Sequence, residues 1–244
     1  MTETNDYFTV EPRGTGVVLL TISREAENNL LDAAALRKLT EWLGAAERNP
    51  ELRVIIITGA GEACFASGPD DADLNERGRL SATLTSLSKP VIAAVNGRAV
   101  GAGADLALNC HLRVAVAQAV FESFTAGLMT GWHEAGKNQR ERGDLNQADC
   151  LTAEAALNLG LLNQVAADRG ELLAACESFA EKICRNAPLA LSFALAAVNR
   201  GMRMNEDDAM FLETSLFSLC FATSDMQEGT RAFLEKRPPQ FTGR

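Results

Sequence analysis

The sequence lacks the patterns that mark metal sites, disulfide frameworks, membrane spans and nucleic-acid binding. It has only two histidines in 244 residues, and its six cysteines (64, 110, 150, 176, 184 and 220) show no Cys-x-x-Cys spacing, so we expect no metal site. No apolar run reaches the roughly 20 residues of a membrane helix. The net charge of −9 argues against non-specific binding to nucleic acid. The polar first residues are unlike a signal peptide, so we expect a cytoplasmic protein whose cysteines are mostly small buried hydrophobes.

The remaining composition is that of a globular α/β protein. Hydrophobic residues make up 47% of the chain and charged residues 23%. Strand patterns at 17–22, 54–58, 91–95 and 112–117 alternate with helix patterns at 32–48, 80–88 and 102–109. From Thr152 onward the pattern is nearly all helical, with helices expected at 152–160, 170–186, 188–202, 206–221 and 225–235. The alternation predicts sheet layers with crossover helices.

The most informative segment is 91–110. An apolar strand ends at the turn pair Asn96-Gly97, and the small residues Gly101-Ala102-Gly103-Ala104 lead into an apolar helix. Small residues leave the backbone open to a ligand, and the first N–H groups of a helix have no partner within the helix. Such amides can hold the negative oxygen of a carbonyl that is becoming an enolate or a tetrahedral species. Asp105 follows one turn into the helix.

A second segment, 54–70, has the same design. An apolar strand runs into Phe65-Ala66-Ser67-Gly68-Pro69-Asp70. Together with Ala94-Val95-Asn96-Gly97-Arg98-Ala99-Val100-Gly101-Ala102-Gly103, this segment resembles the paired signatures of the crotonase superfamily, the enoyl-CoA hydratase/isomerase family. The resemblance extends from about Tyr7 to the phrase at 233–241. Pro69 stands where the family usually has alanine.

The resemblance implies a fold and an assembly. The expected architecture is a crotonase-like superhelix of ββα units over residues 1–190, which holds the active site. Residues 191–244 are expected to form a C-terminal α-helical oligomerisation region of a homotrimer or hexamer. Met210, Leu212, Leu216, Phe217, Leu219 and Phe221 form an apolar face that suits a subunit interface, although the core of a monomer explains these residues equally well.

The resemblance also assigns an oxyanion hole. Its two backbone donors would be the N–H groups of Ser67 and Ala102, and a backbone N–H remains whichever small side chain the residue carries. The alternative is that both glycine-rich turns merely connect strand to helix. A nucleotide motif is excluded, because Leu106 stands where a dinucleotide fingerprint needs its third glycine.

The carboxylates depart from the family pattern. Asp105 stands in place of one of two glutamates used by hydratases, and it is a candidate acid, base or water anchor. The alternative role of Asp105 is stabilisation of the helix dipole. Thr125 replaces the second glutamate, which favours isomerisation or another enolate reaction over hydration by two carboxylates. Eight residues further, at a position where some relatives place a catalytic aspartate, stands His133, a candidate base.

Other residues are assigned to substrate binding by the resemblance. They are Arg24, Phe65, Gly68, Asp70, Gly101, Trp132, Glu134, Phe233 and Lys236. Phe233 and Lys236 match residues that reach the adenosine end of CoA, often in a neighbouring subunit, whereas the region 24–30 matches the family's CoA phrase poorly. A solvated surface charge is the ordinary alternative for each basic residue. The chain is also shortened between Arg140 and Cys150, where relatives have a further helix.

The sequence therefore predicts an enzyme that binds an acyl-CoA, or a related small carbonyl compound, and stabilises its enolate, as an isomerase or lyase does. Acyl-CoA is expected as a substrate, with no resident cofactor. One alternative is a C–C bond hydrolase that acts on β-diketones without CoA. Another is a catalytically silent homologue that serves as a binding or assembly subunit.

Overall fold

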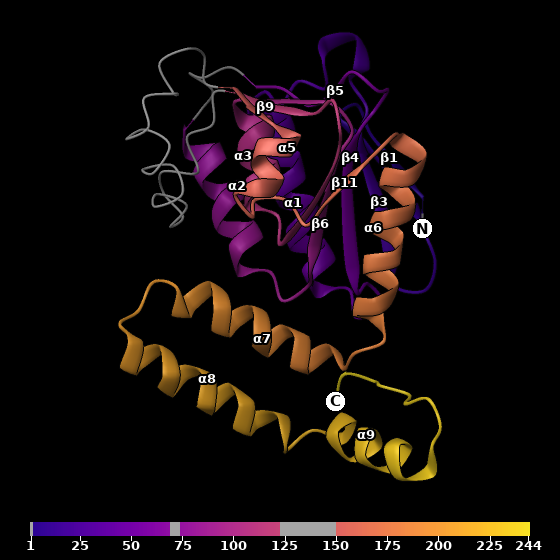
Figure 1. Ribbon diagram of the computed structural model, residues 1–244, viewed down its shortest axis with the longest axis vertical. Helices are drawn as coiled ribbons and strands as arrows, with labels where there is room; N and C mark the ends of the chain where they lie inside the picture. The colour runs from indigo at the N-terminus through magenta and orange to yellow at the C-terminus, as the bar shows by residue number, and fades with distance from the viewer. Residues whose placement is uncertain (1, 69–73, 123–149) are drawn as a thin grey trace.

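The computed structural model describes residues 2–68, 74–122 and 150–244. It shows an α/β body and, along one end of it, a layer of C-terminal helices (Figure 1). The α/β class predicted from the alternation of strands and helices is confirmed. Asp70, Thr125, Trp132, His133 and Glu134 lie outside the described residues.

Seven strands form the main sheet, in the order β1-β2-β3-β4-β6-β8-β11. They are β1 (Glu3–Thr4), β2 (Phe8–Pro12), β3 (Val17–Ile22), β4 (Val54–Gly59), β6 (Val91–Val95), β8 (Leu112–Val116) and β11 (Gln164–Ala166). The first three strands pair antiparallel, and from β3 onward neighbouring strands are parallel. Every residue of β4 and β6 is buried, which is why these strands read as continuous apolar runs.

Four short strands form a second sheet, and three of them come next in the chain after strands of the main sheet. Three central strands of the main sheet are each succeeded by a three-residue strand: β4 by β5 (Cys64–Ala66), β6 by β7 (Arg98–Val100) and β8 by β9 (Val120–Glu122). Strand β10 (Cys150–Thr152) completes the order β10-β9-β7-β5. Because helices follow β5 and β7, the chain repeats a ββα unit, as the family resemblance implies. Strands this short show no periodicity, and the sequence did not predict them.

Three helices of the body, α1 (Ala33–Arg48), α5 (Ala153–Asn158) and α6 (Arg169–Cys184), begin at a residue whose side chain caps the helix. The body also contains η1 (Glu25–Glu27), α2 (Leu74–Ser86) and α3 (Ala102–Asn109). The Asp32 carboxylate accepts the Ala35 N–H at 2.8 Å, and Asp168 caps α6 in the same way. The predicted helix 102–109 is confirmed, whereas α2 begins at Leu74 rather than at residue 80.

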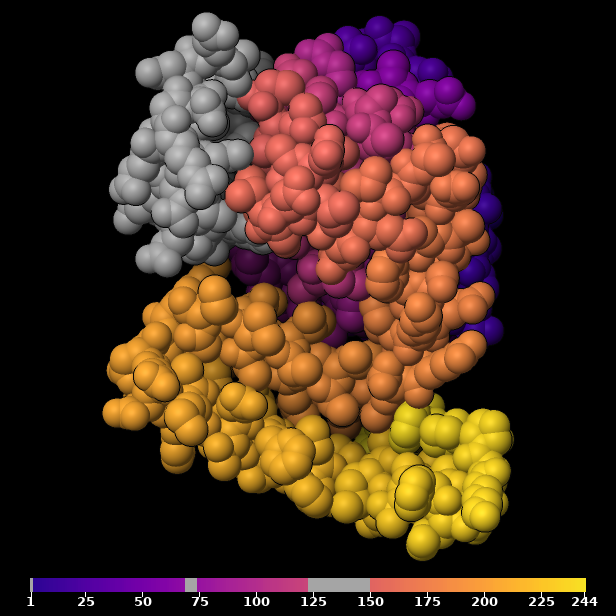
Figure 2. All heavy atoms as spheres, in the orientation of Figure 1, coloured from indigo at the N-terminus to yellow at the C-terminus, as the bar shows by residue number. Residues whose placement is uncertain are grey.

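Three C-terminal helices form a separate layer, α7 (Pro188–Gly201), α8 (Glu206–Cys220) and α9 (Ser224–Glu235). Helices α7 and α8 pack against each other, and Asn199 Nδ2 ties α7 to α2 by a 3.0 Å bond to the Thr85 carbonyl. Figure 2 shows the layer lying across one end of the body. The expected division at residue 190 falls inside α7.

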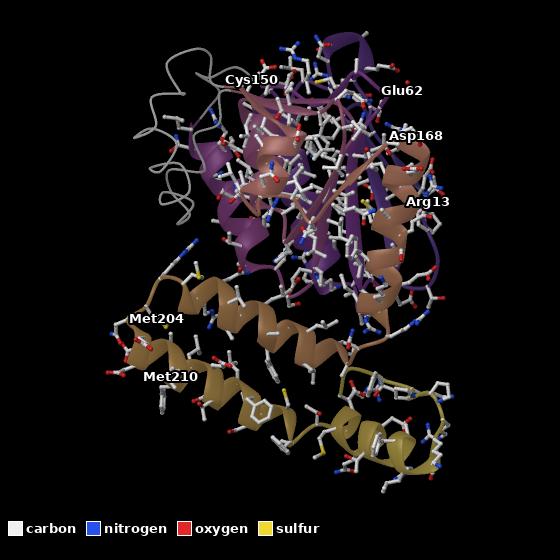
Figure 3. All side chains as sticks on the ribbon, in the orientation of Figure 1. Arg13, Glu62, Cys150, Asp168, Met204 and Met210 are labelled. Atoms are coloured by element: carbon white, nitrogen blue, oxygen red, sulfur yellow. The ribbon has the colours of Figure 1, made fainter. Side chains whose placement is uncertain are left out.

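Large apolar side chains lie exposed on this layer. They include Met202, Met210, Phe211, Phe217, Phe221, Phe233 and Leu234, each more than half exposed. Figure 3 shows Met204, in the turn after α7, and Met210, on α8, at one end of the layer. An apolar surface of this extent typically marks a site of association.

Some of the expected absences can be examined in the residues that the structure describes. Over residues 2–68, 74–122 and 150–244, no helix combines the length and hydrophobicity that a membrane crossing requires. The same residues hold no cluster of three side chains suited to a metal ion. All six cysteines are unpaired; Cys64, Cys110 and Cys176 are buried, whereas Cys150 is exposed and so differs from the expectation of burial.

Candidate active site

The two glycine-rich turns predicted to act together lie against each other. A methyl group at Gly68 would come 2.5 Å from Ala102 Cβ, and one at Gly103 would come 2.0 Å from the Ala66 carbonyl oxygen. The Gly68 N–H also donates to the Val100 carbonyl at 3.1 Å. A Cβ at Gly68 or at Gly103 would therefore clash with the opposite turn. Only glycine at these two positions lets the turns lie this close together.

Helix α3 points its amino-terminal end at this junction. Gly101 precedes it with φ 54° and ψ −117°, a conformation that glycine adopts easily, and donates its N–H to the Glu122 carbonyl at 2.9 Å. Ala102 is the first helical residue, so its N–H has no partner within the helix. Among the residues that the structure describes, none accepts a bond from it. The partial positive charge of the helix end lies at the same place.

The Ser67 N–H has a weak internal acceptor. It lies 3.4 Å from the Asn29 carbonyl oxygen, beyond the usual 2.7–3.2 Å range, while the Ser67 carbonyl accepts the Leu31 N–H at 2.7 Å. The buried side chain of Asn29 holds this stretch in place through Nδ2, which donates to the carbonyls of Cys64 and Ala60. Ser67 therefore lies in an anchored loop, and its own N–H is only weakly engaged within the chain.

Asp105 is buried one turn into α3 and is paired with an arginine that the sequence analysis missed. Arg77, on α2, donates Nε to Asp105 Oδ2 at 3.1 Å, and its Nη2 donates to the same oxygen. Only 8% of Asp105 and 7% of Arg77 is exposed. One signal was available in the sequence: an aspartate inside an apolar helix needs a cation nearby.

A second polar pair joins the same two helices one turn further along. Ser81 Oγ donates to Asn109 Oδ1 at 2.9 Å, and Asn109 Nδ2 donates to the Asp105 carbonyl at 2.8 Å. Arg77, Ser81, Asp105 and Asn109 all line a cleft of about 1250 Å³ between α2, α3 and α7. The Asp105 carboxylate thus borders a space that can hold a small molecule.

Arg24 is occupied locally. Its Nη1 donates to Asp32 Oδ2 at 2.7 Å and to the Leu30 carbonyl at 3.1 Å, and its Nη2 pairs with Glu27. The hydrogen bond to Asp32 is the largest cause of a raised Arg24 pKa. With two carboxylates beside it, this guanidinium is poorly placed to bind a phosphate as well.

The remaining described candidates are widely separated. Phe65 is fully buried in the core, so its side chain supports the loop from behind. Phe233 is 82% exposed on α9, and Lys236 is the left-handed residue that ends this helix. Figure 1 shows α9 and α3 at opposite ends of the molecule, so these two residues cannot meet Asp105 within one chain.

The chain is similar over most of its length to proteins of a known family. The family model described as enoyl-CoA hydratase/isomerase matches residues 13–244. A short-chain-enoyl-CoA hydratase of Clostridium acetobutylicum is 34% identical, covering 91% of this chain and 92% of that protein. A 2,3-dehydroadipyl-CoA hydratase of Escherichia coli is 37% identical, with coverage of 93% and 96%. The crystal structure of an enoyl-CoA hydratase from Bacillus anthracis superposes with a TM-score of 0.82 at 28% identity, covering 98% of this chain and all of that one.

Proposed function

Because the chain belongs to the enoyl-CoA hydratase/isomerase family, we propose that it binds an enoyl-CoA thioester and stabilises the enolate formed at the thioester carbonyl. The observation that carries this proposal is the contact between the Ser67–Gly68 turn and the first turn of α3. The oxygen would accept the N–H groups of Ser67 and Ala102. Donors held in place before the reaction stabilise developing charge without reorganisation.

Asp105 is the carboxylate that moves the proton in this proposal. It lies on the first turn of α3, close to the Ala102 amide, and borders the cleft. During hydration it would accept a proton from the attacking water and return it to the α-carbon as the enolate collapses. Hydration is the reaction that the names of the curated relatives favour. Thr125, in place of a second glutamate, instead favours isomerisation of the double bond.

One substitution tests the amide of Ala102 directly. In Ala102→Pro the donor is lost, and the ring occupies the place of the hydrogen. Proline is tolerated at the first position of a helix. A residue before proline prefers an extended backbone. Gly101 has φ 54° and ψ −117°, and inverting the signs of both angles gives an extended conformation. Because glycine is achiral, the two conformations are equally accessible to it, so Gly101 should accept proline at position 102. We therefore expect a folded variant with kcat reduced about 10²–10³-fold.

The assay follows crotonyl-CoA in deuterated water, reading loss of the conjugated double bond by ultraviolet absorbance and deuterium at the α-carbon by NMR. Hydration gives a 3-hydroxyacyl-CoA, whereas isomerisation moves the double bond to the β,γ position. Both remove the conjugated absorbance and place deuterium at the α-carbon, so the NMR spectrum of the product distinguishes them. An Ala102→Pro variant with the wild-type unfolding midpoint and wild-type activity would remove this amide from the mechanism. If wild type neither hydrates nor exchanges any enoyl-CoA, the thioester proposal fails, leaving diketone hydrolysis or a silent subunit.

The proposal includes assembly into a homotrimer or hexamer. The exposed apolar side chains of α8 and α9 support it, since a monomer rarely leaves so many uncovered. Assembly would also explain how Phe233 and Lys236 could bind substrate although they lie far from Asp105. These residues lie far from Asp105 in their own chain, and the proposal is that they contact CoA bound to a neighbouring subunit.

A further inference from the structure

Arg77 is the one arginine whose side chain reaches the candidate carboxylate from another element in the described residues. It stands on the first turn of α2, and both Nε and Nη2 donate to Asp105 Oδ2 on α3. We infer that Arg77 is a positioning residue, which fixes the orientation and the negative charge of the Asp105 carboxylate for the reaction. This inference rests on the proposed function.

Stability alone does not account for the pair. Removing two charges from water costs about as much as their attraction returns, so an apolar pair of similar volume would hold the helices equally well or better. Helices α2 and α3 are already joined elsewhere. Leu80, Leu84 and Leu106 close around a small space behind Asp105, and Ser81 bonds to Asn109. An ion pair at the wall of the cleft is therefore better explained by what it does to Asp105.

The two-donor contact restricts the carboxylate in a way that one donor cannot. A guanidinium that places two N–H groups on the same oxygen holds that oxygen in place more firmly than one N–H group does. Such control matters more for aspartate than for the glutamate of the family pattern, because the shorter side chain has less reach to correct an error. A displacement of about 1 Å at a reacting group can cost 10²-fold in rate.

The burial of the pair adds a second effect. Since only 6% of the Arg77 side chain and 11% of the Asp105 side chain is exposed, little water is available to stabilise the carboxylate charge. The adjacent cation supplies that stabilisation. Loss of Arg77 should therefore slow the chemical step through Asp105, while binding of the CoA portion, which Arg77 does not contact in the proposal, should be little affected.

The test is a double-mutant cycle on crotonyl-CoA turnover. Arg77→Met removes the charge with little loss of volume, and Asp105→Asn removes its partner. We expect Arg77→Met to lower kcat about 10²-fold with KM changed less than about threefold. If Arg77 acts through Asp105, the double variant will be no slower than Asp105→Asn alone. It also removes both charges of the pair together, so it stays informative if Arg77→Met folds poorly.

Matched controls separate positioning from structure. Arg37→Met makes the same substitution at an exposed arginine of α1, and Asp168→Asn makes the aspartate-to-asparagine change at the cap of α6. Both should keep wild-type kcat. Added guanidinium ion should restore part of the activity of Arg77→Ala, whose truncated side chain leaves room for the ion, and none of that of Asp105→Asn.

Two results would overturn the inference while wild type is active: losses that multiply in the double variant, or an Arg77→Met enzyme with normal kcat. If the wild-type protein is inactive on every enoyl-CoA, the proposed function is refuted, and the inference about Arg77 is refuted too because it rests on that function. Arg77→Lys keeps the charge and loses the two-donor geometry. We expect Arg77→Lys to be less active than wild type and more active than Arg77→Met. If Arg77→Lys is no more active than Arg77→Met, the charge has no role.

Discussion

The stability of the protein should depend on pH through one histidine. His111 immediately precedes β8, and its Nδ1 accepts the Val91 N–H at 3.0 Å. Its Nε2 is buried and meets no partner among the described residues. Burial, and to a smaller extent the nearby Arg113, lowers the pKa of His111 from 6.5 to about 4. The folded protein thus holds this ring neutral where the unfolded chain protonates it.

The sign and size of the effect follow from these two values. Above pH 6.5 the ring is neutral in both states, and the stability of the folded state is unaffected. As the pH falls from 6.5 to about 4, the unfolded chain takes up a proton that the folded chain does not, so the free energy of unfolding decreases. At about 1.4 kcal/mol for each pKa unit, the loss is about 3 kcal/mol when complete.

The comparison uses His111→Asn, because the asparagine Oδ1 can accept the Val91 N–H as Nδ1 does and does not titrate. Urea unfolding at several values between pH 7 and pH 4 gives the free energy of unfolding of both proteins. The slope with pH is compared rather than the absolute stability, since the smaller side chain leaves a void. We expect wild type to lose about 3 kcal/mol more than the variant over this range. Parallel curves would refute the reasoning.

Further predictions concern packing and assembly. Gly103→Ala should lower the free energy of unfolding by more than about 2 kcal/mol, because its methyl would meet backbone atoms of Ala66, whereas Gly78→Ala, with nothing within 4 Å on the exposed side of α2, should raise it by about 0.5–1 kcal/mol. Equal effects in urea unfolding would contradict the close contact of the turns. Light scattering should give three or six times the chain mass of 26.1 kDa, and Phe217→Glu, on the exposed face of α8, should shift the mass toward one chain. A wild-type mass of 26.1 kDa would refute the proposed assembly.

Much of the body could be predicted from local patterns. Strands β4 and β6 are buried along their whole length, so their sequences are unbroken apolar runs. Helix α1 begins at the cap residue Asp32, as predicted. The start of α2 was missed because residues 74–79 are polar and include Gly78, which gives no apolar period to recognise.

The candidate site could be predicted only in part. Ser67, Ala102 and Asp105 were found because motifs of fixed spacing carry them. Arg77 was not found, since its partner is 28 positions away and the pairing depends on how α2 crosses α3. No local pattern encodes such a crossing. The local ion pairs that occupy Arg24 were missed for a related reason, because they depend on how the chain turns between residues 24 and 32.

The close approach of Gly68 and Gly103 to the opposite turn has an evolutionary consequence. A main-chain amide persists through almost any mutation, so a lineage can exchange the small residues at 67 and 102, as the serine and alanine here illustrate. At 68 and 103 even one added carbon would separate the turns. Purifying selection should therefore fall hardest on the two positions whose contribution is the space they leave empty.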